Sequence, residues 1–542
     1  MKLKDYTLKA TTIRDLVRIQ GALGDKPLAI LDGETLTYAQ ADIAANRVAN
    51  SLIALGVRKG DVVATYLYNS LDHIALWFGC AKIGAIWAPM NIALINVDLA
   101  HTINDTGARV LVVDAGLLKN YLPIRDRVVR PDRIEVLRGR PQDGEADGEA
   151  GDGWTPFDAL LDGAAEEPVC DVHWSDPAGL IFTGGSTGLP KGTLVANAWY
   201  FPGIYRYYEM FRPTSDDVHM AIGQMYHTIG SAVDILSPLY FGMTTVLGHW
   251  FSASRFWDTV RAHRATISVV IGPALLTLNG QPVRPDDGDN PLRIIGTASG
   301  GMPRSVVEAF SARFGVDVLE LYGQTETGPL GCFSQRIDDR PYHSLGTANG
   351  WADVMIGDRH GQPCAAGVVG EILLRPVYPG SFMLGYFNRP DKYAESCRDL
   401  WFHTGDLGHL DERGYLHFDG RVAHVISRRG ENIAAVEVES VLLTHPAVRR
   451  CAVVGVPSQE TGDDEVKAYV EIAADAAFEP LDLIKHCEDR IAYFKVPRYV
   501  EVLAQFPLSA TKGEIERHKL KALGVNGAWD REAVGYKVRR RA

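Results

Sequence analysis

Apolar and polar residues follow two periodic patterns in the first part of the chain, one typical of strands and one typical of helices. Short apolar runs rich in β-branched residues, at 61–68 (DVVATYLY) and 108–114 (ARVLVVD), predict buried strands. The longer stretch 42–56 (DIAANRVANSLIALG) repeats its apolar residues at the helical period and ends at a glycine, as helices often do. Strand therefore alternates with helix here, which is typical of βα units.

The same alternation of strands and helices is predicted in the middle of the chain, and a different pattern follows Gly414. Four further apolar runs predict mostly parallel sheets covered by helices: TTVLGHW, ATISVVIGP, LRIIGTASG and VDVLELYG. Beyond Gly414, short strands and a helix in an α+β order indicate a separate domain. We expect an α/β fold, with a large domain over residues 1–420 and a small, mobile α+β domain over residues 421–542.

Composition narrows the class of protein. The chain has 542 residues, 46% of them hydrophobic, and a formal charge of −12, which argues against a nucleic-acid partner. The beginning of the chain lacks a signal-peptide pattern, and no run approaches the roughly 20 apolar residues of a membrane span, so we expect a cytoplasmic protein. Seven cysteines without a CxxC spacing argue against a disulfide framework and a zinc site.

The acidic stretch 141–153 predicts a mobile solvated loop or a negatively charged flap.

The sharpest chemical signal is LIFTGGSTGLPKGTL at 180–194. An apolar strand leads into glycines, hydroxyls and a lysine, so backbone N–H groups, hydroxyls and an ammonium can converge on a polyphosphate. The segment is not a Walker loop, because Pro190 precedes Lys191 where that loop requires glycine. The candidate phosphate-binding residues are Thr183, Gly184, Gly185, Ser186, Thr187, Gly188 and Lys191.

This signature resembles the phosphate-binding motif of the adenylate-forming superfamily, which includes acyl-CoA ligases, peptide-synthetase adenylation domains and firefly-type luciferases. Gly184 stands where serine is common, which removes one hydroxyl and leaves the backbone donors. Further motifs follow in the family's order over nearly the whole chain. The resemblance implies ATP or AMP, CoA and Mg²⁺ as ligands, with a carboxylic acid or its acyl-adenylate as substrate.

Three further segments resemble parts of the family's large domain. YGQTETG, at 322–328, is similar to the segment whose tyrosine stacks near adenine, whose threonine meets the α-phosphate and whose glutamate helps to hold Mg²⁺. GTASGGMP resembles the wall between adenine and the acyl pocket, and GQMYHTIG carries a histidine that lines the acyl and pantetheine channel, although a lone histidine is more often structural. The residues carried over are Tyr322, Gly323, Gln324, Thr325, Glu326, Gly300, Gly301, Met302 and His227.

Later motifs resemble the domain boundary and the CoA site. Asp406 matches the carboxylate that accepts both ribose hydroxyls, and Arg421 matches the boundary arginine that contacts ribose or phosphate. In ISRRGENI, which is closest to carnitine-type ligases, Gly430 would line the pantetheine tunnel and Arg428 or Arg429 would meet the nucleotide of CoA. The hinge position, usually aspartate or lysine, is Ala423.

One departure concerns the lysine that the family uses to bridge the substrate carboxylate and the α-phosphate. In PLSATKGEIERHKL, at 507–520, that position falls on Glu514 when counted back from IERHKL, and on Gly513 when counted forward from Pro507. A carboxylate there would repel two other anions. Three explanations stay open. The loop shifts so that Lys512 takes the place of the missing lysine, or the adenylation step is impaired while thioester formation is intact, or some third arrangement applies.

Other functions stay open as well. An enzyme that loads an amino acid onto a carrier protein would carry an aspartate soon after the aromatic of GQMYHTIG, where this chain has His227 and only a later Asp234. Two alternatives remain. One is a ligase that uses an amine in place of CoA, and the other is a non-catalytic homologue that binds an adenylate. Gly300, Gly301 and the aromatic stretch 200–211 suggest a bulky apolar acid, although that stretch fits a core helix equally well. The family suggests a homodimer.

Overall fold

The computed structural model describes residues 2–3, 6–128, 132–139, 153–183, 189–298, 302, 304–335, 341, 344–428, 431–457, 464–474, 476–488, 490–509 and 514–538. Most of the acidic stretch, 141–152, lies outside these residues. The chain divides into two compact units, unit 1 (Met1–Val354 and Leu374–Phe402) and unit 2 (Met355–Leu373 and His403–Ala542). The domain boundary between residues 420 and 421 stays a prediction.

The first large sheet of unit 1 has the order β21-β11-β10-β6-β5-β7-β8-β9. Strand β5 pairs in parallel with both β6 and β7, whereas β10 and β11 form an antiparallel pair. All five residues of β5 and of β7 are buried, as the apolar runs predict for a sheet covered on both faces. The strands are β5 Val62–Tyr66, β6 Ile86–Pro89, β7 Val110–Asp114, β8 Ile134–Arg138, β9 Thr155–Pro156, β10 Pro177–Thr183, β11 Lys191–Ala196 and β21 Gly385–Tyr386.

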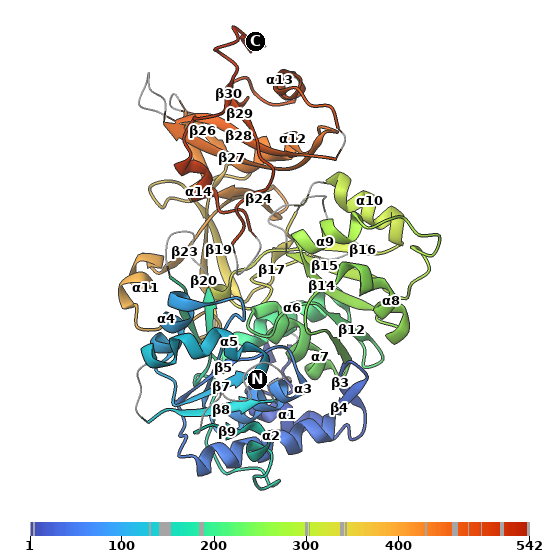
Figure 1. Ribbon diagram of the computed structural model, residues 1–542, viewed down its shortest axis with the longest axis vertical. Coiled ribbons are helices and arrows are strands. Elements are labelled where there is room, and N and C mark those ends of the chain that lie inside the picture. The colour runs from blue at the N-terminus through green and yellow to red at the C-terminus, as the bar shows by residue number, and fades with distance from the viewer. Residues whose placement is uncertain are drawn as a thin grey trace. The chain divides into compact units, whose positions relative to one another are not determined.

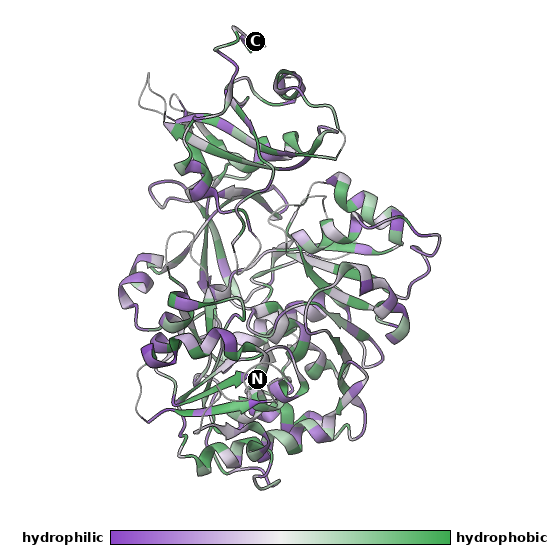
Figure 2. Cartoon of the chain, viewed as in Figure 1, coloured by the Kyte–Doolittle hydropathy of each residue, from purple (hydrophilic) through white to green (hydrophobic). Residues whose placement is uncertain are grey.

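The second large sheet has the order β16-β15-β14-β12-β13-β3-β4 and is parallel except for the β3–β4 pair. Figure 1 shows α8, α9 and α10 beside it, and their apolar residues form one buried cluster with those of β14 and β15. In Figure 2 the strands of both sheets are mostly hydrophobic. The strands are β3 Pro27–Leu31, β4 Glu34–Thr37, β12 Val218–Ala221, β13 Thr244–Leu247, β14 Ile267–Ile271, β15 Ile294–Ala298 and β16 Asp317–Leu321.

The helices of unit 1 begin and end at recognisable signals. Thr37 caps α2 through a reciprocal capping box with Gln40, and Gly107 ends α4 in the left-handed conformation. A π-helix, η5 (Ile229–Leu236), interrupts the α-helical pattern. The α-helices are α1 Ile13–Gly21, α2 Tyr38–Ala54, α3 Leu71–Lys82, α4 Asn96–Thr106, α5 Leu118–Tyr121, α6 Tyr200–Phe211, α7 Ser237–Phe241, α8 Ala253–His263, α9 Gly272–Asn279, α10 Arg304–Phe314 and α11 Pro390–Ser396.

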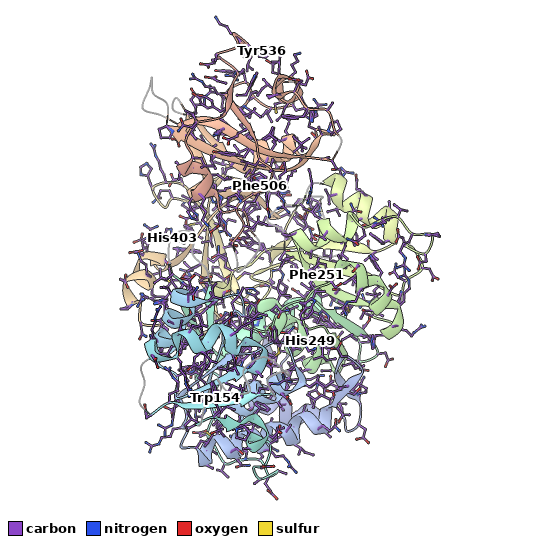
Figure 3. The ribbon with its side chains drawn as sticks, in the orientation of Figure 1. Trp154, His249, Phe251, His403, Phe506 and Tyr536 are labelled. Atoms are coloured by element: carbon purple, nitrogen blue, oxygen red, sulfur yellow. The ribbon has the colours of Figure 1, made fainter. Side chains whose placement is uncertain are left out.

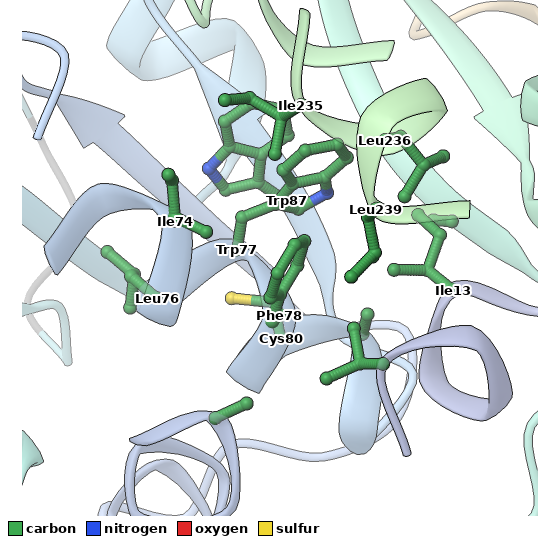
Figure 4. Packing of buried hydrophobic residues seen from close by; sticks show 14 of the residues in the cluster. Ile13, Ile74, Leu76, Trp77, Phe78, Cys80, Trp87, Ile235, Leu236 and Leu239 are labelled. Atoms are coloured by element: carbon green, nitrogen blue, oxygen red, sulfur yellow. The ribbon is translucent and has the colours of Figure 1, made fainter. Parts of the chain in front are cut away.

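A tryptophan stack lies at the centre of the largest apolar cluster. The rings of Trp77 on α3 and Trp87 on β6 are 4.7 Å apart and nearly parallel, and Ile235 and Leu236 of the π-helix belong to the same cluster (Figure 4). All four side chains are fully buried or nearly so. The first sheet, its covering helix and the π-helix therefore share one core.

Unit 2 has the predicted α+β pattern. Its four-stranded sheet, in the order β27-β28-β29-β30, combines antiparallel and parallel pairs and packs against α12 and α13. The elements are β24 Leu416–Arg421, β25 Val425–Arg428, β26 Glu431–Ala434, α12 Ala435–Leu442, β27 Val448–Pro457, β28 Asp464–Ile472, α13 Pro480–Glu488, β29 Tyr499–Val502, α14 Arg517–Ala522 and β30 Trp529–Asp530. A further sheet, whose residues are divided between unit 1 and unit 2, contains β19 Ala352–Gly357, β20 Gly370–Pro376, β22 Cys397–Arg398 and β23 Trp401–Leu410.

The α/β fold predicted from the apolar rhythm, with a large part of mostly parallel sheets and a smaller α+β part, is confirmed. A search of the described residues for a helix long and apolar enough to span a bilayer found none.

Candidate active site

The predicted phosphate-binding segment joins β10 to β11. Thr183 is the last residue of β10 and Lys191 the first of β11, and the two face each other in the antiparallel register. Both are half-buried. The residues between them that were predicted to bind phosphate, Gly184, Gly185, Ser186, Thr187 and Gly188, lie outside the described residues. The structure thus defines the two ends of the connection.

Tyr386 links Lys191 to Glu326. It lies on β21, which pairs with β11, and its hydroxyl donates a hydrogen bond of 2.9 Å to Glu326 Oε1. Lys191 Nζ lies 5.3 Å from the centre of the Tyr386 ring. Burial, reinforced by the negative charge of Glu326, raises the pKa of the Tyr386 phenol well above its ordinary value, so this hydroxyl stays a donor. No role was predicted for Tyr386 from the sequence, although it lies in a stretch that resembles a family motif.

Thr325 and Glu326 lie in the short 3₁₀ helix η6 (Thr325–Thr327). The indole of Trp199 donates a 2.8 Å hydrogen bond to the carbonyl of Thr325, and the Thr325 hydroxyl lies 3.2 Å from that of Thr228. Thr228 directly follows His227. The structure therefore brings the segment predicted to meet the α-phosphate next to the one predicted to line the acyl channel.

Tyr322 and Gly323 precede this turn in a tightly packed crossing of the chain. A Cβ on Gly323 would lie 2.7 Å from the backbone nitrogen of Gly331, and one on Gly331 would lie 2.3 Å from the carbonyl oxygen of Tyr322. Arg206, fully buried on α6, donates a 2.7 Å hydrogen bond to that same carbonyl, and burial lowers the pKa of its guanidinium to about 9. Gln324 caps η6. Close backbone contact leaves no room for side chains at either glycine.

Met302 is anchored by a buried glutamate that the sequence analysis did not identify. The backbone N–H of Met302 donates a 2.7 Å hydrogen bond to Glu320 Oε1, and Glu320 lies on β16. Glu320 is only 6% exposed. Gly300 and Gly301, predicted to form the wall beside adenine, lie outside the described residues.

The turn that carries His227 is held by hydrogen bonds and close backbone packing within unit 1. The N–H of His227 donates to the carbonyl of Gln224, and a Cβ on Gly230 would lie 2.0 Å from that carbonyl oxygen. Asp234 Oδ2 accepts a 2.9 Å hydrogen bond from the N–H of Gly223. Asp234 is fully buried, with Oδ1 2.8 Å from His219 Nε2. Its carboxylate is therefore engaged within the protein core.

In unit 2, Asp406 and Arg421 face each other on β23 and β24. Arg421 Nε lies 3.2 Å from Asp406 Oδ1, and the aspartate side chain is 4% exposed while that of the arginine is 51% exposed. Arg428 is nearly buried, with Nε 2.7 Å from Glu465 Oε2 and a hydrogen bond to the carbonyl of Phe494. The other predicted CoA-binding residues, Arg429 and Gly430, lie outside the described residues.

Glu514 lies beside an antiparallel bridge in unit 2 between Leu508 and Ile515, and we call these two paired segments the hairpin. Ser509 donates its N–H to the carbonyl of Glu514 at 2.8 Å, and the N–H of Glu514 donates to Ser509 Oγ at 3.2 Å. Phe506, labelled in Figure 3, lies just before this hairpin, and its N–H donates a 2.9 Å hydrogen bond to Glu471. Arg517, just after it, lies 2.8 Å from both carboxylate oxygens of Glu439. Glu514 itself is exposed, and Lys512 and Gly513 lie outside the described residues.

Comparison with known proteins decides the family. A family model described as AMP-binding enzyme matches residues 18–387, and one described as AMP-binding enzyme C-terminal domain matches residues 437–512. The chain belongs to the AMP-binding enzymes. The resemblance drawn from the phosphate-binding motif is therefore confirmed, and this AMP-binding enzyme has the fold expected of that family.

Its relatives include several acyl-CoA ligases. The chain is 31% identical over 514 residues to a crotonobetaine/carnitine–CoA ligase of Salmonella typhi, covering 93% of this chain and 97% of the relative. The anthranilate CoA ligase AuaEII, solved with anthranoyl-AMP, is similar in structure, with a TM-score of 0.85, 26% identity, and coverage of 96% of this chain and 99% of that one. ATP-bound MatB from Rhodopseudomonas palustris has a TM-score of 0.83 at 25% identity, covering 94% and 99% of the two chains. This AMP-binding enzyme lies in the acyl-CoA ligase branch of the adenylate-forming superfamily.

Proposed function

We propose that this AMP-binding enzyme is an AMP-forming acyl-CoA ligase that converts a carboxylic acid, through its acyl-adenylate, to a CoA thioester in the cytoplasm. The observation that carries the proposal is the convergence of Lys191, Tyr386 and Glu326 beside Thr325. These residues supply an ammonium, a fixed carboxylate and a hydroxyl at one end of the β10–β11 connection. Its CoA-ligase relatives support the choice of CoA as acceptor.

In the first half-reaction, a carboxylate oxygen attacks the α-phosphorus of ATP and the bond to pyrophosphate breaks. Catalysis of such a step consists chiefly of positioning and charge stabilisation. Lys191 and the donors of residues 183–188 would hold the phosphates, and Thr325 would meet the α-phosphate. Tyr322, with the wall at Gly300 and Gly301, would hold adenine.

Glu326 is the residue proposed to hold Mg²⁺. Mg²⁺ usually binds one or two carboxylates together with substrate phosphates and waters, so a single fixed carboxylate near a phosphate-binding lysine fits this ion. When bound, the ion neutralises phosphate charge. Among the described residues there is no cluster of three or more His, Cys, Asp or Glu side chains suited to a metal ion.

In the second half-reaction, the thiol of CoA loses its proton, attacks the acyl carbon, and AMP leaves. Asp406 and Arg421 would contact ribose, and His227 and Gly430 would line the acyl and pantetheine channel. Because Arg428 is paired with Glu465 in unit 2, Arg429 is the better candidate for the nucleotide of CoA. The acid that we propose is bulky and apolar, and the enzyme is proposed to act as a homodimer.

The two half-reactions are expected to differ in rate in this enzyme. Counted back from IERHKL, Glu514 takes the position of the family's bridging lysine, and a carboxylate brought to about 4 Å from another anion would cost about 4 kcal/mol at an effective dielectric constant of ~20. We propose that the adenylation half is strongly slowed while thioester formation is kept. Such an enzyme would mainly convert a supplied acyl-adenylate to acyl-CoA.

Two assays test these statements separately. ATP/pyrophosphate exchange with a panel of acids measures adenylation, and CoA consumption from synthetic acyl-adenylates measures thioester formation. The panel should include anthranilate and crotonobetaine. We expect thioester formation with weak exchange. Robust exchange that disappears in Lys512→Ala would show instead that Lys512 is the catalytic lysine.

The same assays distinguish the alternatives. Amide products formed when amines replace CoA would reveal an amine-using ligase, and tight adenylate binding without turnover would reveal a non-catalytic homologue. Loading of an amino acid onto a carrier protein has less support, because the carboxylate of Asp234 is buried against His219 and Gly223. An ammonium group of a substrate would find that carboxylate already occupied.

A further inference from the structure

We propose that Tyr386 is a positioning residue that sets the carboxylate of Glu326 and the ammonium of Lys191 for a metal-bound triphosphate. This inference rests on the proposed nucleotide site. No role for Tyr386 was predicted from the sequence, and the proposed function uses only its place beside Lys191 and Glu326. Three features of the residue support this role: its backbone hydrogen bonds, the contact of its hydroxyl and the contact of its ring.

The backbone around Tyr386 is fixed between the two predicted ligand-binding segments. The N–H of Phe387 donates to the carbonyl of Gly192, and the N–H of Leu384 to that of Leu194, each at 2.8 Å. The N–H of Met383 donates at the same distance to the carbonyl of Glu326. Tyr386 is thus tied on one side to the strand that begins at Lys191 and on the other to the turn that carries Glu326.

The hydroxyl of Tyr386 restrains the carboxylate of Glu326. The terminal torsion of a glutamate is broad, so its carboxylate has no strongly preferred plane of its own. A hydrogen bond of 2.9 Å from a half-buried phenol to Oε1 selects one orientation. Groups that hydrogen-bond to a metal-binding carboxylate orient it, and their loss typically weakens metal binding by about 10- to 100-fold.

The ring of Tyr386 contacts the other charged group. With Nζ of Lys191 5.3 Å from its centre, the ring attracts the ammonium through its π-face without neutralising the positive charge. A carboxylate in the same place would compete with phosphate for the lysine. An aromatic ring therefore keeps Lys191 near the start of β11 and leaves its charge for an anionic ligand.

Two substitutions separate these roles. Tyr386→Phe removes only the hydroxyl, whereas Tyr386→Leu removes the ring as well. The matched control is Tyr393→Phe, which makes the same change on α11, on a residue that is 37% exposed. Equilibrium Mn²⁺ binding in the presence of ATP is followed by electron paramagnetic resonance, and ATP binding without metal by calorimetry.

We expect Tyr386→Phe to weaken Mn²⁺ binding in the ATP complex by about 10- to 100-fold while leaving metal-free ATP binding unchanged. Tyr386→Leu should in addition weaken metal-free ATP binding, and Tyr393→Phe should change neither. If Tyr386 acts through Glu326, adding Tyr386→Phe to Glu326→Gln causes no further loss of Mn²⁺ binding.

Three results would count against these statements in different ways. Wild-type Mn²⁺ affinity in Tyr386→Phe would overturn the role of the hydroxyl. Full additivity with Glu326→Gln would show that Tyr386 does not act through Glu326. A wild-type protein that binds no ATP, with or without metal, would instead refute the proposed function on which the inference rests.

Discussion

His219 and Asp234 form a buried pair inside unit 1, with Nε2 of the imidazole 2.8 Å from Oδ1 of the carboxylate. Because a carboxylate only accepts, Nε2 donates, and Nδ1 of the same ring lies 2.8 Å from the hydroxyl of Tyr207. The second oxygen of Asp234 accepts from Gly223 at the start of the His227 turn. The pair connects β12, α6 and the π-helix to that turn.

Asp234→Ala should destabilise unit 1 strongly. The substitution leaves the Nε2–H of a fully buried His219 and the N–H of Gly223 without their acceptor, which typically costs about 3–5 kcal/mol for a broken buried pair. Urea unfolding measures the loss, and Asp216→Ala, at an exposed position of the same unit, is the control. A loss no larger than that of the control would show that the pair does not stabilise the turn.

Acid should destabilise unit 1 through His73. Burial lowers the pKa of this imidazole to about 3, and its Nε2 lies 2.9 Å from the hydroxyl of Thr65. Since the unfolded chain takes up a proton near pH 6.5 and the folded one does not, stability is full above pH 6.5 and falls as the pH falls toward 3. The loss is about 1.4 kcal/mol per pH unit.

Urea unfolding at pH 6.5 and pH 5.0 checks this expectation. The wild type should lose about 2 kcal/mol more than His73→Gln over that interval. His173→Gln, at an exposed position of unit 1, should behave as the wild type. Equal pH dependence in all three proteins would contradict a depressed pKa at His73.

Arg517 should hold the hairpin that carries Glu514. Its guanidinium lies 2.8 Å from both oxygens of Glu439, whose Oε1 also accepts from the N–H of Val453. Arg517→Met keeps the length of the side chain, removes the charge, and should lower the stability of unit 2 by about 1–3 kcal/mol. Hydrogen–deuterium exchange of residues 506–520 should rise, whereas Lys519→Met, at an exposed position, should leave it unchanged. Unchanged exchange in Arg517→Met would show that the pair does not restrain the hairpin.

Much of the fold could be predicted because the apolar periods are strong. The runs at 61–68 and 108–114 became β5 and β7, and 42–56 became most of α2. The aromatic stretch 200–211, left open between pocket lining and core, is the helix α6, and most of it is buried. Long runs with one period specify an element whatever surrounds them.

The contacts of the site were harder to predict. Tyr386 and Glu326 are 60 residues apart in sequence, and only the pairing of β21 with β11 brings the tyrosine beside Lys191. Likewise, a single histidine and a single aspartate 15 residues apart carry no signal that they form a buried pair. Motifs indicate which groups a site contains, whereas the groups that orient them depend on tertiary contacts.

Glu514→Lys should raise ATP/pyrophosphate exchange by about tenfold or more, because it places a positive charge where the substrate carboxylate and the α-phosphate meet. Glu514→Gln is the matched control, since it removes the repulsion without supplying the bridging charge, and its gain should be smaller. Thioester formation from an acyl-adenylate should stay unchanged in both variants. A fall in exchange in Glu514→Lys would refute the assignment of Glu514 to the lysine position.

The most direct test of the proposed ligase is a single measurement of acyl-CoA formed from synthetic acyl-adenylates and CoA by the purified wild-type protein, followed by mass spectrometry. The proposal predicts that at least one adenylate of an aromatic or other bulky acid yields acyl-CoA and AMP in equal amounts, and that Tyr322→Ala reduces the yield. Tight binding of these adenylates with no acyl-CoA formed would contradict it.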